Sequence, residues 1–226
     1  METSRYRAVT LDAHGVLLLP DPAAFGDAVG RFGAERDDER CWRAHYEMTE
    51  LLDSMLDVDY ERLNRSFAAA LGIATDLHKE AAPILRDLYL STRWVPAPGA
   101  RHAVAELASR GFQLAVISNT AHGEIESVLA RTGICAVGDS HRPVTAVLDS
   151  KVVGLSKPEP EIFKMALDAL GVPPEQTVHV GDSYRDDVAG ATAVGMTAVH
   201  IDPAGRCRRS DPIHAASLAD WVANLP

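Results

Sequence analysis

Hydrophobic residues along the chain gather in short runs, separated by longer segments with helical spacing. The runs are rich in β-branched residues and apolar at nearly every position, which is typical of parallel strands covered on both faces. The four clear runs are Ala8–Leu11, Leu114–Ile117, Thr177–Val180 and Thr197–Ile201. A weaker form of the same pattern covers Thr145–Leu148. Together the runs predict a parallel β-sheet.

Segments between the later runs carry apolar residues three and four positions apart, as amphipathic helices do. One such segment is Ala100–Arg110, which stops at Gly111, and another is Glu159–Leu170, which stops at Gly171. Glycine is a common residue at helix ends because it adopts the left-handed conformation without strain. Strands that alternate with helices indicate βαβ crossovers. The predicted fold class is therefore α/β, with a doubly wound, Rossmann-like parallel sheet.

The segment from about Pro20 to Pro96 interrupts this alternation. It shows no convincing strand, but Asp21-Pro22 has the form of a helix start. Three further helical stretches follow, at Asp38–Leu56, Asp59–Leu71 and His78–Leu90. We therefore predict an inserted α-helical cap domain of residues 20–96, within a core domain of residues 1–19 and 97–226.

Composition and charge narrow the classes of partner. Of the 226 residues 46% are hydrophobic and 24% charged, as in ordinary globular proteins, and 32 acidic residues against 22 basic ones give a net charge of −10. This balance argues against nucleic acid or an anionic membrane as partner. A small phosphorylated molecule stays possible, because a local basic group can override the overall charge. Oligomeric state cannot be read from these properties.

Cysteine usage and the N-terminus indicate a cytoplasmic location. The three cysteines, Cys41, Cys135 and Cys207, are far apart and form no CxxC pair, so we expect neither a disulfide framework nor a zinc site. The histidines likewise show no metal-ligand spacing. Residues 1–6 lack the apolar stretch of a signal peptide, and no window approaches the ~20 apolar residues of a membrane helix.

Polar residues follow the predicted strands at the point where each strand ends. In open α/β sheets, ligands bind at the carboxyl ends of the strands. The residues concerned are Asp12-Ala13-His14-Gly15, Ser118-Asn119-Thr120, Lys157-Pro158 and Gly181-Asp182-Ser183, with Asp186 and Asp187 just beyond. We therefore expect carboxylates, a hydroxyl and a lysine from four separate segments to meet at one edge of the sheet.

In order and spacing, this set resembles the four motifs of the haloacid dehalogenase-like (HAD) hydrolase superfamily, in its helical-cap (C1) type. The resemblance covers about residues 5–204 and rests on the sequences VISNT, SKPEPEIF and VGDSYRDDVAGA. It implies that Asp12 is a nucleophile that forms a covalent aspartyl intermediate, and that Lys157 neutralises charge during the reaction. Ser118 and Asn119 would bind the substrate.

The same resemblance implies a bound Mg²⁺, held by Asp12, Asp182 and Asp187 and by the backbone carbonyl of His14. General chemistry agrees, because a phosphate dianion that meets a carboxylate nucleophile needs a cation to offset the repulsion. Mg²⁺ prefers oxygen ligands, often one or two carboxylates together with the substrate phosphate. The function expected is a Mg²⁺-dependent phosphatase that acts on a small phosphorylated metabolite.

The first motif departs from the phosphatase pattern Asp-x-Asp-Gly-Thr, since His14 replaces the second Asp and Val16 the Thr. In one interpretation, His14 takes over the acid–base role, because an imidazole donates and accepts protons near neutral pH. In another, the leaving group needs no proton, as in L-2-haloacid dehalogenases, whose Asp-Ala-Tyr-Gly-Thr is similar to the start of DAHGVL. Arg43, 31 residues after Asp12, would then bind the substrate carboxylate.

A third interpretation is a phosphate-binding relative without turnover. The fourth motif favours the phosphatase. Dehalogenases of this superfamily need no metal, and they carry another residue in place of the first acid of the fourth motif. This chain keeps Asp182 and adds Asp186 and Asp187. Such a cluster of carboxylates would repel itself without a cation.

Overall fold

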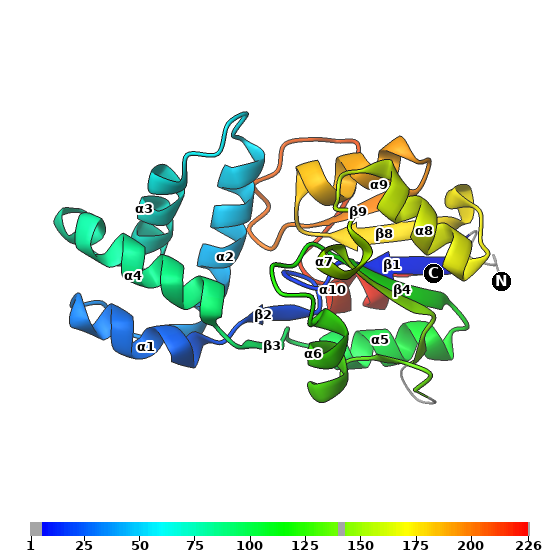
Figure 1. Ribbon diagram of the computed structural model, residues 1–226, viewed down its shortest axis with the longest axis horizontal. Helices are drawn as coiled ribbons and strands as arrows, with labels where there is room; N and C mark the ends of the chain where they lie inside the picture. The colour runs from blue at the N-terminus through cyan, green and yellow to red at the C-terminus, as the bar shows by residue number, and fades with distance from the viewer. Residues whose placement is uncertain (1–5, 140–142, 226) are drawn as a thin grey trace. The chain divides into compact units, whose positions relative to one another are not determined.

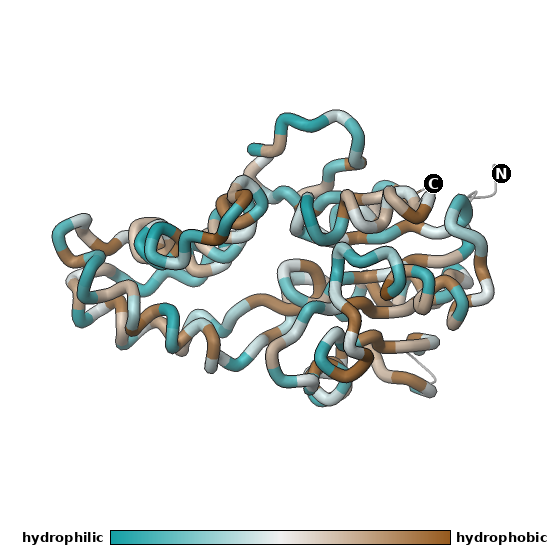
Figure 2. Tube along the Cα trace, turned by 45° about the horizontal axis from the view of Figure 1, so that its top comes forward, coloured by the Kyte–Doolittle hydropathy of each residue, from teal (hydrophilic) through white to brown (hydrophobic). Residues whose placement is uncertain are grey.

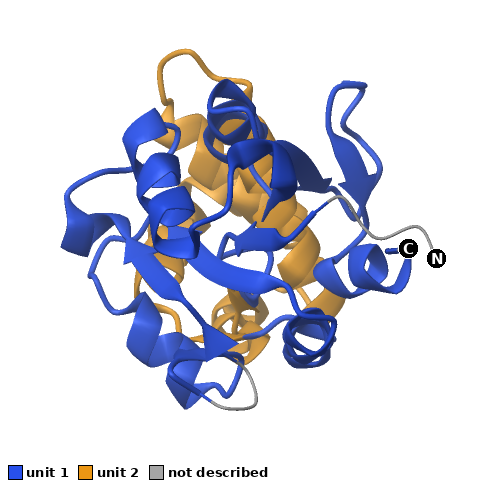
Figure 3. Cartoon of the chain, turned by 90° about the vertical axis from the view of Figure 1, so that its right-hand side faces the viewer, with its two compact units in different colours: residues 1–18, 96–226 blue, residues 19–95 orange. Residues whose placement is uncertain are grey.

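The computed structural model describes residues 6–139 and 143–225 and divides into two compact units (Figure 3). Unit 1 combines the chain up to Leu18 with the chain from Pro96 onward, and unit 2 is Leu19–Val95. These limits differ by one residue at each junction from the boundaries expected for the core and the cap.

Unit 1 is built on a sheet of six parallel strands in the order β10-β9-β8-β1-β4-β7 (Figure 1). The strands are β1 (Ala8–Leu11), β4 (Gln113–Ser118), β7 (Ala146–Asp149), β8 (Thr177–Gly181), β9 (Thr197–Ile201) and β10 (Ile213–Ala215). The predicted doubly wound α/β fold is confirmed. Strand β10 was not expected, because two of its three residues are exposed and its sequence is too short to show a pattern.

Helices cover both faces of this sheet (Figure 1). Helix α8 packs through Ile162 and Phe163 against Ile117 of β4, and it ends at Gly171 in the left-handed conformation, as expected. Hydrophobic and hydrophilic positions alternate along the helices (Figure 2). The helices of unit 1 are α5 (Ala100–Ser109), α6 (Ile125–Arg131), α7 (Ser150–Val153), α8 (Pro160–Leu170), α9 (Gly190–Ala193) and α10 (Leu218–Ala223), with the short 3₁₀ helix η2 (Pro174–Gln176) and the π-helix η3 (Tyr184–Ala189).

Unit 2 is a helical unit with a core of its own, centred on Phe25, Phe67 and Leu85. An aspartate side chain caps three of the helices, accepting a hydrogen bond from a backbone N–H of the first turn, and this capping fixes where they begin. The elements are α1 (Pro22–Arg31), α2 (Asp38–Asp53), α3 (Tyr60–Ala70), η1 (Thr75–Leu77) and α4 (His78–Ser91).

The expectation that the segment from Pro20 to Pro96 contains no strand is wrong at its two ends. There β2 (Leu18–Pro20) and β3 (Trp94–Pro96) pair with one another. Three residues are too few for an alternating pattern to be recognised. A second small pair joins β5 (Ala136–Val137) and β6 (Pro143–Val144).

Across residues 6–139 and 143–225, every helix is too short or too polar to cross a lipid bilayer.

Candidate active site at the carboxyl edge of the sheet

Apart from Arg43, the expected site residues come from the carboxyl ends of three neighbouring strands, from the segments that follow them and from the loop before α8. Strand β1 lies between β4 and β8, with Leu11 paired to Val116 on one side and Val180 on the other. Asp12 and Asp182 directly follow β1 and β8. Because the three strands are parallel and in register, their ends form one continuous edge.

A buried lysine joins two of the carboxylates at this edge. The Lys157 Nζ atom lies 2.8 Å from Asp12 Oδ1 and 2.6 Å from Asp187 Oδ1. The Lys157 side chain is only 2% exposed, so solvent screens neither contact. One oxygen from each of Asp12, Asp182 and Asp187 lies within 4.8 Å of the others. The structure thus brings four of the expected residues together.

Two buried residues that the sequence interpretation did not place in the site extend this network into the sheet. His179 Nε2 lies 3.0 Å from Asp187 Oδ1, and His179 Nδ1 lies 2.8 Å from the Thr10 hydroxyl. Thr10 and His179 occupy paired positions in β1 and β8, and both are fully buried. Polar residues at matched positions of two apolar runs were the signal available in the sequence.

Burial and charge shift the ionisation of these groups in different directions. Burial raises the pKa of Asp12 well above its ordinary value; the Lys157 ammonium opposes this rise, and Asp187 and Asp182 add to it. Burial alone would raise the pKa of Asp187 as well, but Lys157 and the His179 ring hold it below its ordinary value. For Lys157 the two carboxylates outweigh burial and raise its pKa. Burial lowers the pKa of His179, which is therefore neutral at neutral pH.

The charges of this cluster leave an excess of negative charge. Three carboxylates face one ammonium, and His179 is neutral, so full ionisation gives a net charge of −2. A buried excess of this size is unfavourable unless a cation compensates it. Oxygen donors from carboxylates suit Mg²⁺, whose charge would bring the total to zero. The residues present therefore fit a divalent cation.

Ser118 and Asn119, both expected to bind substrate, have different surroundings. The Ser118 hydroxyl is fully buried, and within the described part of the chain it has no hydrogen-bond partner. The Asn119 amide instead donates to the Lys157 carbonyl and accepts from the Lys157 N–H, at 2.9 Å each. Asn119 therefore fixes the backbone that carries the lysine, while the Ser118 hydroxyl retains a bonding capacity for another molecule.

Asp149, at the end of β7, is a further residue that the sequence interpretation missed. Its buried carboxylate accepts hydrogen bonds from the Thr120 hydroxyl and from the backbone N–H groups of Ile125 and Lys151. These bonds hold the loop that follows Ser118. An aspartate directly after an apolar run was visible in the sequence, but the run at Thr145–Leu148 was the least clear of the five.

Two glycines make room for the carboxylates. Gly15 has a φ of +77°, and a Cβ atom added to it would lie 2.3 Å from Asp182 Cγ. A Cβ on Gly181 would lie 2.1 Å from Asp187 Cγ. Real side chains do not approach so closely, so any larger residue at these positions would displace an acid of the cluster.

We expect Gly15→Ala to reduce Mg²⁺ affinity and to destabilise the fold by about 1–3 kcal/mol more than a matched glycine substitution. Gly111→Ala is the match, because Gly111 has a φ of +85° and its added Cβ would meet no atom within 4 Å. Urea unfolding and Mg²⁺ titration of both variants measure the difference. Equal losses in the two variants would show that Asp182 moves aside freely.

His14 and Arg43 complete the expected set. His14 is half-buried and follows Asp12 by two residues, at the turn closed by the Gly15 N–H and the Leu18 carbonyl. Arg43 belongs to α2 of unit 2, where its exposed side chain lies 3.8 Å from Glu47 Oε1. Its role towards a substrate stays a prediction.

Comparison with known proteins agrees with this geometry. Residues 6–195 match the family model of the haloacid dehalogenase-like hydrolases. A phosphoserine phosphatase of Thermus thermophilus is 35% identical over 139 residues, which are 61% of this chain and 53% of that protein. A glyceraldehyde 3-phosphate phosphatase of Methanothermobacter thermautotrophicus is 36% identical over 107 residues, which are 47% of this chain and 45% of that protein. The chain spans about half the length of the curated relatives it matches.

Among solved structures, a dehalogenase with an intermediate complex shares the fold, with a TM-score of 0.61 and 22% identity over 97% of this chain and 96% of that one. The family match covers most of the chain, including the segments that contribute Asp12, Ser118, Lys157 and Asp182. The chain therefore belongs to the haloacid dehalogenase-like hydrolase family.

Proposed function

We propose that this protein is a Mg²⁺-dependent phosphatase that hydrolyses a small phosphorylated metabolite through a covalent aspartyl phosphate. The observation that carries the proposal is the buried cluster of Asp12, Asp182 and Asp187 around Lys157, with its excess of two negative charges. Two of the curated relatives are named as phosphatases, which supports a phosphate ester as the substrate class.

The contacts of Asp12 suggest which of its oxygens attacks. Among the described residues, both polar contacts of the Asp12 side chain fall on Oδ1, which accepts from the Ala13 N–H at 2.6 Å and from Lys157. Oδ2 is then the oxygen that forms a bond to phosphorus, while the bond between phosphorus and the ester oxygen breaks. Water next attacks the aspartyl phosphate, which releases phosphate and restores Asp12. Lys157 offsets the negative charge that gathers in both steps.

Asp12, Asp182 and the His14 carbonyl would hold Mg²⁺, which when bound screens the repulsion between the phosphate and Asp12. Asp187 contributes mainly by orienting Lys157, because Oδ1 already contacts Lys157 and His179 and Oδ2 accepts from the Ser183 N–H. The Ser118 hydroxyl binds a phosphate oxygen. Asn119 keeps the lysine backbone in place.

Unit 2 is, in this proposal, the helical cap of the family, and the protein works in the cytoplasm. All three cysteines are free thiols, which suits a reducing compartment.

The test is an assay of two substrate panels, phosphate monoesters and 2-haloacids, each with Mg²⁺ and with EDTA. We expect release of phosphate that depends on Mg²⁺ and no release of halide. Turnover of haloacids that survives EDTA would replace this proposal with the dehalogenase. Binding of a phosphate mimic without any turnover would indicate a relative that has lost catalysis.

The dehalogenase remains the second candidate because of one observation, the absence of a second aspartate in Asp12-Ala13-His14-Gly15. In that reaction Asp12 attacks carbon, halide leaves without a proton, and Arg43 binds the substrate carboxylate. Asp182 and Asp187 argue against it, because the reaction requires no cation and gains nothing from the added negative charge.

His14 is the proposed acid–base group, donating a proton to the leaving oxygen and later accepting one from water. We expect His14→Ala to lower kcat about 10²–10⁴-fold. It should also remove a limb of the pH–rate profile that titrates in the neutral range, because an imidazole ionises there. His102→Ala, at an exposed position on α5, is the control. A variant that is slower but keeps the wild-type pH profile would exclude this role.

A further inference from the structure

Outside the carboxylate cluster, unit 1 contains a second group of side chains with metal-binding chemistry. One ligand atom from each of His200, Cys207 and His214 lies within 4.8 Å of the others. His200 belongs to β9, His214 to β10, and Cys207 to the loop between the two strands. A metal was not expected here from the sequence, because ligands seven residues apart match no common spacing.

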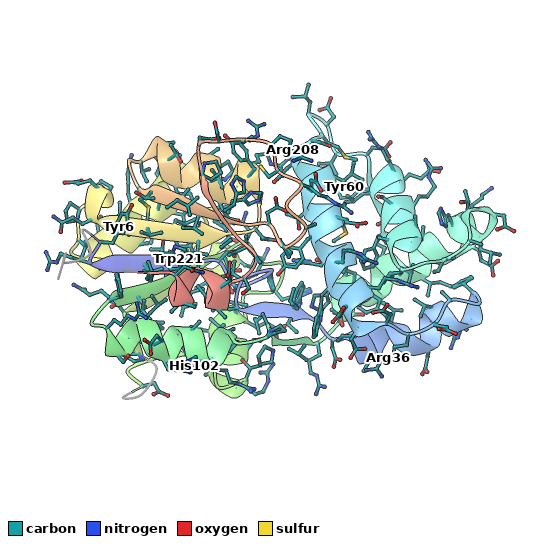
Figure 4. All side chains as sticks on the ribbon, turned by 180° about the vertical axis from the view of Figure 1, so that it is seen from behind. Tyr6, Arg36, Tyr60, His102, Arg208 and Trp221 are labelled. Carbon is teal, nitrogen blue, oxygen red and sulfur yellow. The ribbon has the colours of Figure 1, made fainter. Side chains whose placement is uncertain are left out.

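Strand pairing and a local hydrogen-bond network bring the three residues together. His200 and His214 are paired neighbours in the parallel strands β9 and β10, so their rings lie on the same face, with centroids 5.5 Å apart. The loop turns back over them because the Asp202 carboxylate accepts the backbone N–H groups of Arg206 and Cys207, at 3.1 and 2.8 Å. Figure 4 labels the following residue, Arg208, on this loop.

His200 is held in the form that a metal ligand requires. Its Nε2 atom lies 3.1 Å from the backbone carbonyl of Asp182, and a carbonyl only accepts hydrogen bonds, so Nε2 carries the proton. In the neutral ring Nδ1 then holds the free lone pair. A histidine that binds a metal commonly donates its other N–H to a backbone carbonyl in this way.

No hydrogen-bond donor of the described structure reaches that lone pair. His200 is only 8% exposed, and its Nδ1 atom has no hydrogen-bond partner among residues 6–139 and 143–225. A buried polar atom without a partner is unfavourable and calls for an explanation. A metal ion bound between His200, Cys207 and His214 supplies one.

We propose that His200, Cys207 and His214 form a binding site for a transition-metal ion of the Zn²⁺ class. Two imidazoles and a thiolate are soft or borderline ligands, which favour Zn²⁺ and disfavour Mg²⁺. Bond lengths of about 2.0–2.3 Å to zinc require the three ligand atoms to draw closer together than their present spacing. The side chain of His214 is exposed, so solvent leaves space for that movement. Three protein ligands leave a fourth position for water.

The test uses Co²⁺ and Zn²⁺ as probes on the full chain, after treatment with chelator and with Mg²⁺ in excess to occupy the carboxylate cluster. We expect one equivalent of Co²⁺ to produce a thiolate-to-cobalt charge-transfer band, and Zn²⁺ to displace it. Only a cysteine ligand gives this band, so binding at the carboxylates cannot imitate it. Cys207→Ser should abolish the band, and His214→Gln should weaken Co²⁺ binding more than about tenfold.

Two control variants separate this site from other thiols and histidines. Cys41→Ala, in unit 2, and His122→Gln, at an exposed position of unit 1, should keep the band and the wild-type affinity. A wild-type protein that gives no band, or a Cys207→Ser variant that keeps it, would overturn the proposal. Because the readout is spectroscopic, the outcome does not depend on whether the protein is a phosphatase.

Discussion

Replacing Asp12 by Asn should reduce phosphate-ester turnover by about 10⁴-fold or more, the scale of loss that removal of a nucleophile causes in other enzymes. An amide has nearly the shape of a carboxylate but cannot form the acyl phosphate. Asp168→Asn makes the same chemical change at an exposed position of α8 and should leave turnover unaltered. Turnover of Asp12→Asn within tenfold of the wild type would refute the proposed mechanism.

The same variant should be at least as stable as the wild type when no divalent cation is present. The folded-state pKa of Asp12 is raised, so ionisation of Asp12 at neutral pH costs folding free energy that the amide does not. The advantage should shrink as the pH falls from the raised folded-state pKa of Asp12 towards its ordinary value near ~4, below which Asp12 is neutral in both states. Added Mg²⁺ should make the wild type more stable than the variant, because the ion binds the wild type more tightly. Urea unfolding with EDTA and with Mg²⁺ measures these effects.

Replacing Lys157 by Met should give the largest loss of stability, about 3–5 kcal/mol in EDTA at neutral pH. Methionine fills a similar volume, but Asp12 and Asp187 lose their buried counter-charge. Turnover should also fall, because the charge that gathers during phosphoryl transfer is no longer offset. A divalent cation partly replaces the missing charge, so Mg²⁺ should stabilise Lys157→Met more than it stabilises the wild type.

Lys164→Met provides the comparison for this loss. Lys164 lies on α8 with its side chain 60% exposed, and its nearest acid, Glu161, is 3.8 Å away. A surface pair of this kind contributes little, so the change should stay within about 0.5 kcal/mol. If the two lysine variants unfolded at the same urea concentration, the buried ion pairs would have no measurable energetic role.

Long apolar runs were sufficient to predict most of the fold. Strands β1 and β9 begin and end where the hydrophobic pattern does, because nearly every residue of each is buried, including the polar Thr10 and His200. The strands that the pattern missed are two or three residues long, and pairing with a neighbour defines them more than their own composition does. β10 is recognisable only beside β9.

The site was predictable where a residue stands directly after such a run, as Asp12 and Ser118 do, or one residue further on, as Asp182 does. Contacts that depend on three-dimensional register were not. His179 joins the site network because Thr10 lies beside it on the next strand. His200 belongs to the proposed metal site because His214 lies beside it on the next strand. For Asn119, the residue was identified but its partner was not, since its bonds to Lys157 join positions 38 residues apart.

The place of β1 in the middle of the sheet has a consequence for biosynthesis. Its partner strands β4 and β8 begin at Gln113 and Thr177, so β1 leaves the ribosome long before either neighbour exists. A nascent chain that ends before residue 157 carries Asp12, the proposed nucleophile, without Lys157 and without Asp182 and Asp187. The core of unit 2 is made only of residues from unit 2, so all of these residues are synthesised much earlier. The proposed catalytic activity is thus expected only after the last third of the chain has been synthesised and has docked.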